Sequence, residues 1–169
     1  MNLDDTGIRG LTSMGRAAGA LLKERGQTLA VSESASGGLI SAALLSIPGA
    51  SAYFTGGAAN YTHTAREAFI GFSLDDHPGM RSSTEPFVEV GAKTVRELLG
   101  TTWGVAEAGA AGPTGNRYGD DAGHSCIAIA GPVNKVITIE TGDADREANM
   151  WRFAEEVLKA FEAALLEAG

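Results

Sequence analysis

One seven-residue segment combines the residue types that nucleophilic catalysis and anion binding require. It spans residues 32–38 and reads Ser-Glu-Ser-Ala-Ser-Gly-Gly, between two apolar stretches. A serine at a tight turn before a Gly-Gly helix start exposes its hydroxyl, and nearby backbone N–H groups can stabilise an oxyanion or hold a phosphate. Ser34 is therefore a candidate nucleophile, with the amides near Gly37 and Gly38 as candidate oxyanion donors.

The same segment also has a structural interpretation, which the local sequence alone favours. Ser34 and Ser36 can cap the helix that follows, and the two glycines can simply permit the turn. The segment is neither a P-loop nor a Gly-x-Ser-x-Gly elbow. Local residue types therefore leave both interpretations open.

Hydrophobic spacing predicts the elements that position this turn. Apolar residues recur at helical spacing before Gly26, which predicts a first helix that ends at this glycine. Residues 28–32 are predicted to form a short buried strand, and residues 39–47 a helix. Thr62 is a suitable N-cap for a helix to about residue 70, with Arg66 on its second turn. The remaining predicted elements are a glycine-rich strand that follows residues 52–54 and ends near Tyr61, a loop at 71–83, a helix from Thr84, a strand at 101–108, a glycine-rich loop at 109–123, a hairpin of strands at 125–130 and 133–140, and a last helix from about Asp143.

Alternating helices and short strands predict an α/β fold. We expect a single three-layer α/β/α domain over residues 1–169, with a mixed, mostly parallel sheet of about five strands. In such sheets ligands bind beyond the carboxyl ends of the strands. The Ser34 turn, the turn at Tyr61 and the loop that begins at Gly109 are therefore expected to converge on one pocket.

Composition narrows the classes of function. The 13 basic and 21 acidic residues give a net charge of −8, which argues against nucleic acid as a partner. No apolar run is long enough to span a membrane, no signal peptide is visible, and the single cysteine, Cys126, cannot form a disulfide within the chain. We expect a cytoplasmic protein that binds neither nucleic acid nor membrane.

Metal-ligand spacing is absent from the sequence. Three scattered histidines and one cysteine predict no metal site and no cofactor. The adjacent Asp120 and Asp121 are best explained as a solvated loop, although a divalent ion bound together with a substrate phosphate is an alternative.

Five motifs occur in order along the chain, and together they resemble one family. They are Ser-Glu-Ser-Ala-Ser-Gly-Gly at 32–38, Ile-Pro-Gly-Ala-Ser-Ala-Tyr-Phe at 47–54, Asn-Tyr-Thr-His-Thr-Ala-Arg at 60–66, Thr-Glu-Pro at 84–86 and Ala-Ala-Gly-Pro-Thr-Gly at 110–115. This pattern resembles the C-terminal domain of the CinA proteins, the family of stand-alone nicotinamide mononucleotide deamidases. The resemblance covers roughly residues 10–165.

The resemblance implies a homo-oligomer that hydrolyses the carboxamide of a nucleotide to a carboxylate and ammonia, without metal, through a serine/lysine dyad. It places the nucleophile at Ser34, an orienting tyrosine at Tyr61 and the dyad lysine's position at Arg66. The substrate-binding positions that it implies are Glu33, Ser36, Gly37, Gly38, Gly112, Pro113 and Gly115.

The most important departure from the family pattern lies in the dyad. A guanidinium, with a pKa above about 12, cannot be deprotonated to serve as a general base, whereas a desolvated lysine can. His63, one helical turn before Arg66, and His124, after the glycine-rich loop, are alternative bases. A capping or solvated role for His63 and a sheet-packing role for His124 are the structural alternatives.

Two hypotheses from different classes follow. The first is an amidohydrolase of the nicotinamide mononucleotide deamidase type, with Ser34 as nucleophile and Arg66 fixing the substrate. The second is a family member without deamidase activity that binds a nucleotide or another anionic small molecule, with Arg66 holding a carboxylate or phosphate. The family description favours the first, and the chemistry of Arg66 favours the second.

Overall fold

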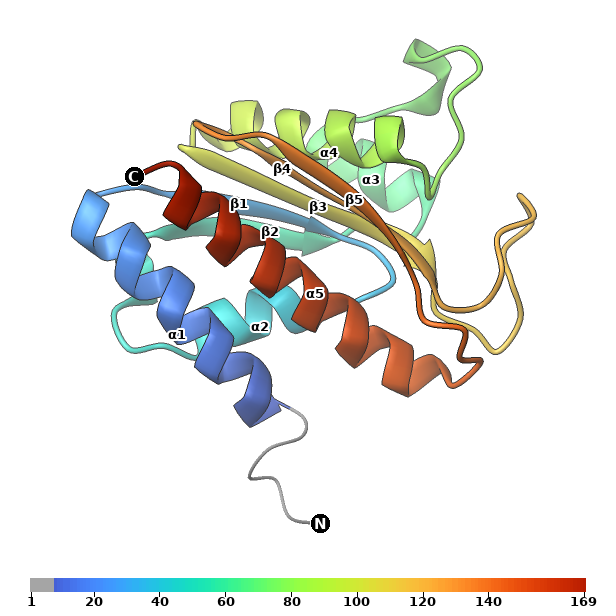
Figure 1. Ribbon diagram of the computed structural model, residues 1–169. Helices are drawn as coiled ribbons and strands as arrows, with labels where there is room; N and C mark the ends of the chain where they lie inside the picture. Colours follow the sequence, from blue (N-terminus) through green and yellow to red (C-terminus); the bar gives the residue numbers. More distant parts are fainter. Residues whose placement is uncertain (1–7) are drawn as a thin grey trace.

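A five-stranded sheet lies at the centre of the protein, with its strands in the order β2-β1-β3-β4-β5 (Figure 1). The computed structural model describes residues 8–169. The strands are β1 (Leu29–Glu33), β2 (Phe54–Ala59), β3 (Trp103–Ala110), β4 (His124–Ala130) and β5 (Lys135–Glu140). β1 pairs in parallel with β2 and β3, whereas β3–β4 and β4–β5 are antiparallel. The predicted mixed sheet and the predicted hairpin are both confirmed.

Helices cover both faces of the sheet, as the three-layer prediction requires (Figure 1). One face carries α1 (Ile8–Arg25), α2 (Leu39–Leu45) and the long α5 (Arg146–Glu167), and the other carries α3 (His63–Ile70) and α4 (Glu85–Leu99). Short 3₁₀ turns at Ala50–Ala52 and Leu74–Asp76 complete the elements. None of the helices within residues 8–169 is long and apolar enough to cross a membrane.

The central strands are buried because each is covered by helices on two sides. Every residue of β1 is buried, and so is every residue of β4. On the face of α1 and α5, Trp103 packs edge-on against Phe161 at 5.7 Å between ring centroids. On the other face, α4 comes so close to β3 that a Cβ at Gly104 would lie 2.0 Å from the carbonyl oxygen of Ala92. Small residues therefore set the spacing of this layer.

Two helix starts follow the predictions, and one shifts. Thr62 caps α3 by accepting the amide of Ala65, and α4 begins directly after Thr84. The last helix begins at Arg146 rather than near Asp143, because the side chain of Asp145 accepts the amide of Ala148 and caps it there. The carboxyl ends of β1, β2 and β3 lead into the segments that form the candidate site.

Candidate functional site

A cavity of about 360 Å³ lies where the sequence places the convergence of three segments. Ser34 follows β1, Tyr61 follows β2, and Arg66 projects from α3, and all three line this cavity. The glycine-rich loop after β3 contributes Asn116, Arg117 and Tyr118 to the lining. Ser82 and Ser83, which precede α4, and Phe87, in its first turn, line the cavity as well.

Ser34 itself has the exposure expected of a reactive residue but lacks a base. Its side chain is half-buried and lines the cavity. Within residues 8–169, the Oγ atom of Ser34 makes no hydrogen bond. The hydroxyl is therefore accessible, but no group in this part of the chain is placed to take its proton.

Glu33, the last residue of β1, holds the Ser34 turn from inside. Its side chain is buried, and its carboxylate accepts the backbone N–H groups of Gly38 (3.0 Å), Ile40 (3.0 Å) and Ser41 (2.7 Å). These amides belong to the start of α2, where the helix has no acceptor of its own for them. The carboxylate of Glu33 thus occupies the position at the helix N-terminus where an external anion was expected.

Glu107 supports the same turn from the neighbouring strand β3. Its buried carboxylate accepts the amides of Ser34 (3.2 Å) and Ser36 (2.9 Å), the hydroxyl of Ser36 (2.8 Å) and that of Ser125 (3.0 Å). Burial raises the pKa of Glu107, and the hydrogen bonds from Ser36 and Ser34 partly oppose that shift. Glu107 is not among the site residues predicted from the sequence, although an acidic residue inside an apolar strand is itself a signal of a buried polar network.

The structure does not support the prediction that the amides near Gly37 and Gly38 donate to an oxyanion. The amide of Gly38 donates to Glu33, and that of Gly37 donates to the carbonyl of Ser34 at 3.1 Å. Ser36 is fully buried, and neither it nor the two glycines line the cavity. These amides are therefore not available to an oxyanion, because acceptors within the chain already take their hydrogens.

Arg66 points into the cavity from α3 and is buried, with 6% of its surface exposed. Its guanidinium lies over the rings of Phe72 (5.2 Å) and Phe87 (4.9 Å), and its Nε donates to the carbonyl of Phe72 at 3.2 Å. Burial lowers the pKa of Arg66, which nevertheless remains a cation. Within residues 8–169 no carboxylate lies within ion-pair distance of it.

His63 lies between two guanidinium groups. Its Nδ1 contacts Nη2 of Arg66 at 2.8 Å, and its Nε2 contacts Nη2 of Arg117 at 2.9 Å. Burial and the charges of both arginines lower the pKa of His63, so the ring is neutral at neutral pH. Because both nitrogens face arginines, His63 is not placed as the base for Ser34.

Tyr61 belongs to a second, smaller cavity as well. This cavity of about 190 Å³ shares Tyr61, Gly109 and Asn116 with the first. Arg146, at the start of α5, donates from Nη2 to the hydroxyl of Tyr61 at 3.0 Å and from Nη1 to the carbonyl of Gly112 at 2.8 Å. Of the predicted loop residues, Gly112 and Gly115 line this cavity and Pro113 does not.

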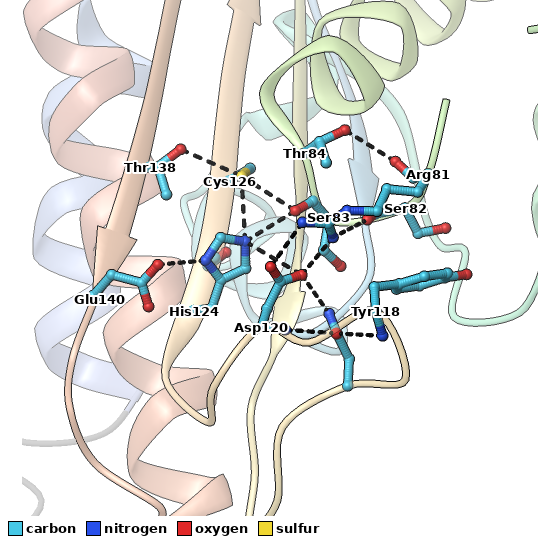
Figure 2. A network of polar contacts seen from close by, with 12 residues as sticks. Arg81, Ser82, Ser83, Thr84, Tyr118, Asp120, His124, Cys126, Thr138 and Glu140 are labelled. Carbon is cyan, nitrogen blue, oxygen red and sulfur yellow. Dashed lines mark hydrogen bonds and ion pairs between the residues drawn. The ribbon is translucent and has the colours of Figure 1, made fainter. Parts of the chain in front are cut away.

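A polar network anchors the glycine-rich loop to the rest of the fold (Figure 2). Asp120 forms a bidentate pair with Arg81, at 2.6 and 2.8 Å, and also accepts the side-chain amide of Asn116. The prediction of a solvated Asp120 is therefore wrong, because the loop folds back on the segment before α4; Asp121 is exposed, as expected.

His124 extends this network and lies outside both cavities. Its Nδ1 contacts the carboxylate of Glu140 at 2.5 Å, and its Nε2 contacts the carbonyl of Ser83 at 2.9 Å (Figure 2). Burial lowers the pKa of His124, but these two hydrogen bonds, with the charges of Glu140 and Asp120, outweigh it and raise the pKa overall. His124 is therefore a structural residue, consistent with its predicted packing role.

No group of three or more potential metal ligands occurs within residues 8–169.

Comparison with known proteins gives the family. The family model for the CinA C-terminal domain matches residues 11–165, nearly the whole chain. The chain belongs to the CinA family. This CinA-family chain is 40% identical over 114 residues to the CinA-like protein of Synechococcus sp. (strain CC9902), covering 66% of the chain and 26% of that protein. It is 36% identical over 133 residues to the CinA-like protein of Synechocystis sp. (strain ATCC 27184 / PCC 6803 / Kazusa), covering 79% and 32%. The chain thus spans about a quarter to a third of the length of these curated relatives.

Solved structures share the fold of this CinA-family protein. The CinA superfamily protein from Klebsiella pneumoniae 700603 superimposes with a TM-score of 0.85 at 21% identity, over 93% of this chain and 98% of that one. The competence/damage inducible protein CihA from Agrobacterium tumefaciens gives 0.76 at 22% identity, over 96% and 94%. At these identities the likeness shows the fold alone.

Proposed function

We propose that this CinA-family protein binds an anionic small molecule of the mononucleotide type in the cavity lined by Ser34, Tyr61 and Arg66. The observation that carries the proposal is the buried guanidinium of Arg66, which faces the cavity without a carboxylate partner in the described chain. An isolated buried charge is costly unless it is paired. A phosphate or carboxylate of a bound ligand supplies that pair.

The positions of His63 and Arg117 support the same proposal. A neutral imidazole has one N–H and one lone pair, yet both nitrogens of His63 contact guanidinium groups. Only one of these contacts can be an N–H···N hydrogen bond, and the other brings two donors together. An anion beside Arg66 and Arg117 accepts the guanidinium hydrogens that His63 cannot.

Hydrolysis of a nucleotide carboxamide is the second candidate. It is favoured by the accessible hydroxyl of Ser34, which lines the same cavity without a hydrogen-bond partner in the described chain. In this mechanism Ser34 attacks the carboxamide carbon, ammonia leaves, and water releases the carboxylate. The missing element is a base, because Arg66 keeps its proton and both nitrogens of His63 are engaged.

One experiment separates the two candidates. Purified protein is titrated with nicotinamide mononucleotide by calorimetry, and ammonia release is followed in parallel for the wild type, Ser34→Ala and Arg66→Lys. Binding without turnover by the wild type, together with ammonia release by Arg66→Lys, supports a binding site that has lost its base.

The matched control is Arg96→Lys, because Arg96 lies on α4 and donates to the carbonyl of Thr102 outside the cavity. This variant is expected to bind like the wild type. Ammonia release by the wild type that disappears in Ser34→Ala would establish the hydrolase instead. Absence of binding to both nicotinamide mononucleotide and inorganic phosphate would overturn the proposal as a whole.

A further inference from the structure

His124, the first residue of β4, contacts two groups that only accept hydrogen bonds (Figure 2). Its Nδ1 lies 2.5 Å from the carboxylate of Glu140 on β5, and its Nε2 lies 2.9 Å from the backbone carbonyl of Ser83, which precedes α4. A neutral imidazole carries one N–H, whereas an imidazolium carries two. Both contacts are therefore hydrogen bonds only when His124 is protonated on both nitrogens.

The other charged and titratable groups around His124 come from the neighbouring elements. The carboxylate of Asp120, in the glycine-rich loop, lies 3.8 Å from Nε2 and also pairs with Arg81, from the segment before α4. The Sγ atom of Cys126 on β4 lies 3.6 Å from Nε2, and Glu85 on α4 adds a negative charge near that thiol. Carboxylates thus face the ring from β5 and from the loop, and they favour its cationic form.

Ser83 connects this contact to the cavity. It lines the cavity together with Ser82, whereas His124 lies outside it. The backbone of Ser83 has a φ of 58°, in the left-handed region that residues other than glycine rarely adopt. Such a conformation persists only when the surrounding structure holds it. The N–H of His124 on the Ser83 carbonyl is one of the contacts that hold it.

Loss of one proton from His124 leaves one N–H for two acceptors. The bond to the Glu140 carboxylate is charge-assisted and is the stronger of the two, so the remaining hydrogen stays on Nδ1. The lone pair of Nε2 then faces the Ser83 carbonyl and the Asp120 carboxylate, and both contacts become repulsive. Deprotonation therefore removes the donor that holds the strained backbone of Ser83.

We propose that His124 is a proton-operated positioning residue, which holds the Ser83 wall of the cavity in place when it is doubly protonated and releases that wall when it is neutral. The wall is held at acidic pH, and the hold is lost as the pH rises through the pKa of His124 in the folded protein. The effect on ligand binding rests on the proposed function, because it concerns the same site, whereas the release of Ser83 is independent of any ligand.

Nuclear magnetic resonance tests the release of Ser83 directly. The imidazole nitrogens of His124 and the backbone amide of Ser83 are followed between about pH 5 and about pH 9 in the wild-type protein. We expect both nitrogens to carry a hydrogen on the acidic side, and the amide of Ser83 to shift with the same midpoint as His124, above about pH 6.5. The midpoint separates this transition from that of His63, whose pKa is lowered.

Glu140→Gln is the variant that isolates the proposed device. Its side-chain amide donates to a neutral Nδ1, so the N–H stays on Nε2 and the Ser83 carbonyl keeps its donor at every pH. We expect Ser83 to lose its transition in this variant, as in His124→Gln, which cannot titrate. The matched control is Glu97→Gln, which changes an exposed glutamate near the end of α4 and should keep the wild-type transition.

A binding measurement tests whether the release of Ser83 reaches the site. Nicotinamide mononucleotide is titrated by calorimetry into the wild type and Glu140→Gln at about pH 6 and about pH 8. The ratio of the two affinities cancels the titration of the ligand itself. We expect the affinity of the wild type relative to Glu140→Gln to be at least about threefold lower at the higher pH, as the loss of one hydrogen bond in the cavity wall implies.

The outcomes distinguish this inference from the proposed function. An amide of Ser83 that does not follow His124, or that keeps its transition in Glu140→Gln, overturns the inference and leaves the proposed function intact. An affinity ratio that does not change with pH overturns the regulation of the site. Failure of both nicotinamide mononucleotide and inorganic phosphate to bind overturns the proposed function and its regulation, and the spectra then decide the release of Ser83 by themselves.

Discussion

The carboxylate of Glu33 is predicted to hold the Ser34 turn and the start of α2 together, and its replacement by the isosteric amide tests this directly. In Glu33→Gln the remaining carbonyl oxygen can still accept from Ser41. The new NH₂ group then faces the amides of Gly38 and Ile40, which now donate to the carboxylate at 3.0 Å each. The variant therefore leaves two donors without an acceptor.

The size of the effect follows from those two donors. A buried donor without a partner costs about 1–3 kcal/mol, and the site can relax only partly because Glu33 is 1% exposed. We expect Glu33→Gln to lower the free energy of unfolding by about 3 kcal/mol, a large share of the typical 5–15 kcal/mol for a domain.

Urea denaturation followed by far-UV circular dichroism measures this change as a shift of the midpoint at constant m-value. The matched control is Glu24→Gln, which changes an exposed glutamate on α1 and should alter stability by less than about 0.5 kcal/mol. A loss below about 1 kcal/mol for Glu33→Gln would refute the assignment of Glu33 as the cap of this turn.

Two further predictions concern the sheet and its network. His124 has a raised pKa when folded, so its stabilising contribution is complete below its unfolded pKa of about 6.5 and is lost as the pH rises through the folded value. The free energy of unfolding of the wild type should therefore fall as the pH rises above about 6.5. It should fall less for His124→Gln, because glutamine cannot form the charged contact with Glu140. Equal slopes of unfolding free energy against pH for the two proteins would contradict this. Gly104→Ala places a Cβ 2.0 Å from the carbonyl oxygen of Ala92, which belongs to the helix backbone, and should cost about 3 kcal/mol in thermal or urea unfolding. A stability equal to that of the wild type would show that α4 can move away from the sheet.

Much of the architecture could be predicted because its signals are local. The N-cap at Thr62, the helix start after Thr84 and the hairpin of β4 and β5 depend on residues near one another in sequence, and the structure confirms all three. The convergence of Ser34, Tyr61 and Arg66 was also predictable, since the carboxyl ends of parallel strands meet at one edge of a sheet.

The partners of the polar groups could not be predicted in the same way. Glu107 is 71 residues from Ser36 in sequence, and Arg81 is 39 residues from Asp120, yet each pair is in hydrogen-bond contact. No local pattern indicates which of many acidic residues fills a given turn. For this reason the sequence placed an external anion at the Gly-Gly segment, where the structure places the carboxylate of Glu33.

The sequence by itself determined the family and the order of the elements, because these depend on residue type and spacing along the chain, and the resemblance to that family places Arg66 at the position of the dyad lysine. Only the tertiary structure decided which hydrogen-bond donors and which cationic side chain are free to contact a ligand. The backbone donors at the start of α2 are taken by Glu33, whereas Arg66 faces the cavity without an acidic partner in the described chain. The physical reason is that pairing of charges and hydrogen bonds depends on distances across the fold, which spacing along the chain does not fix.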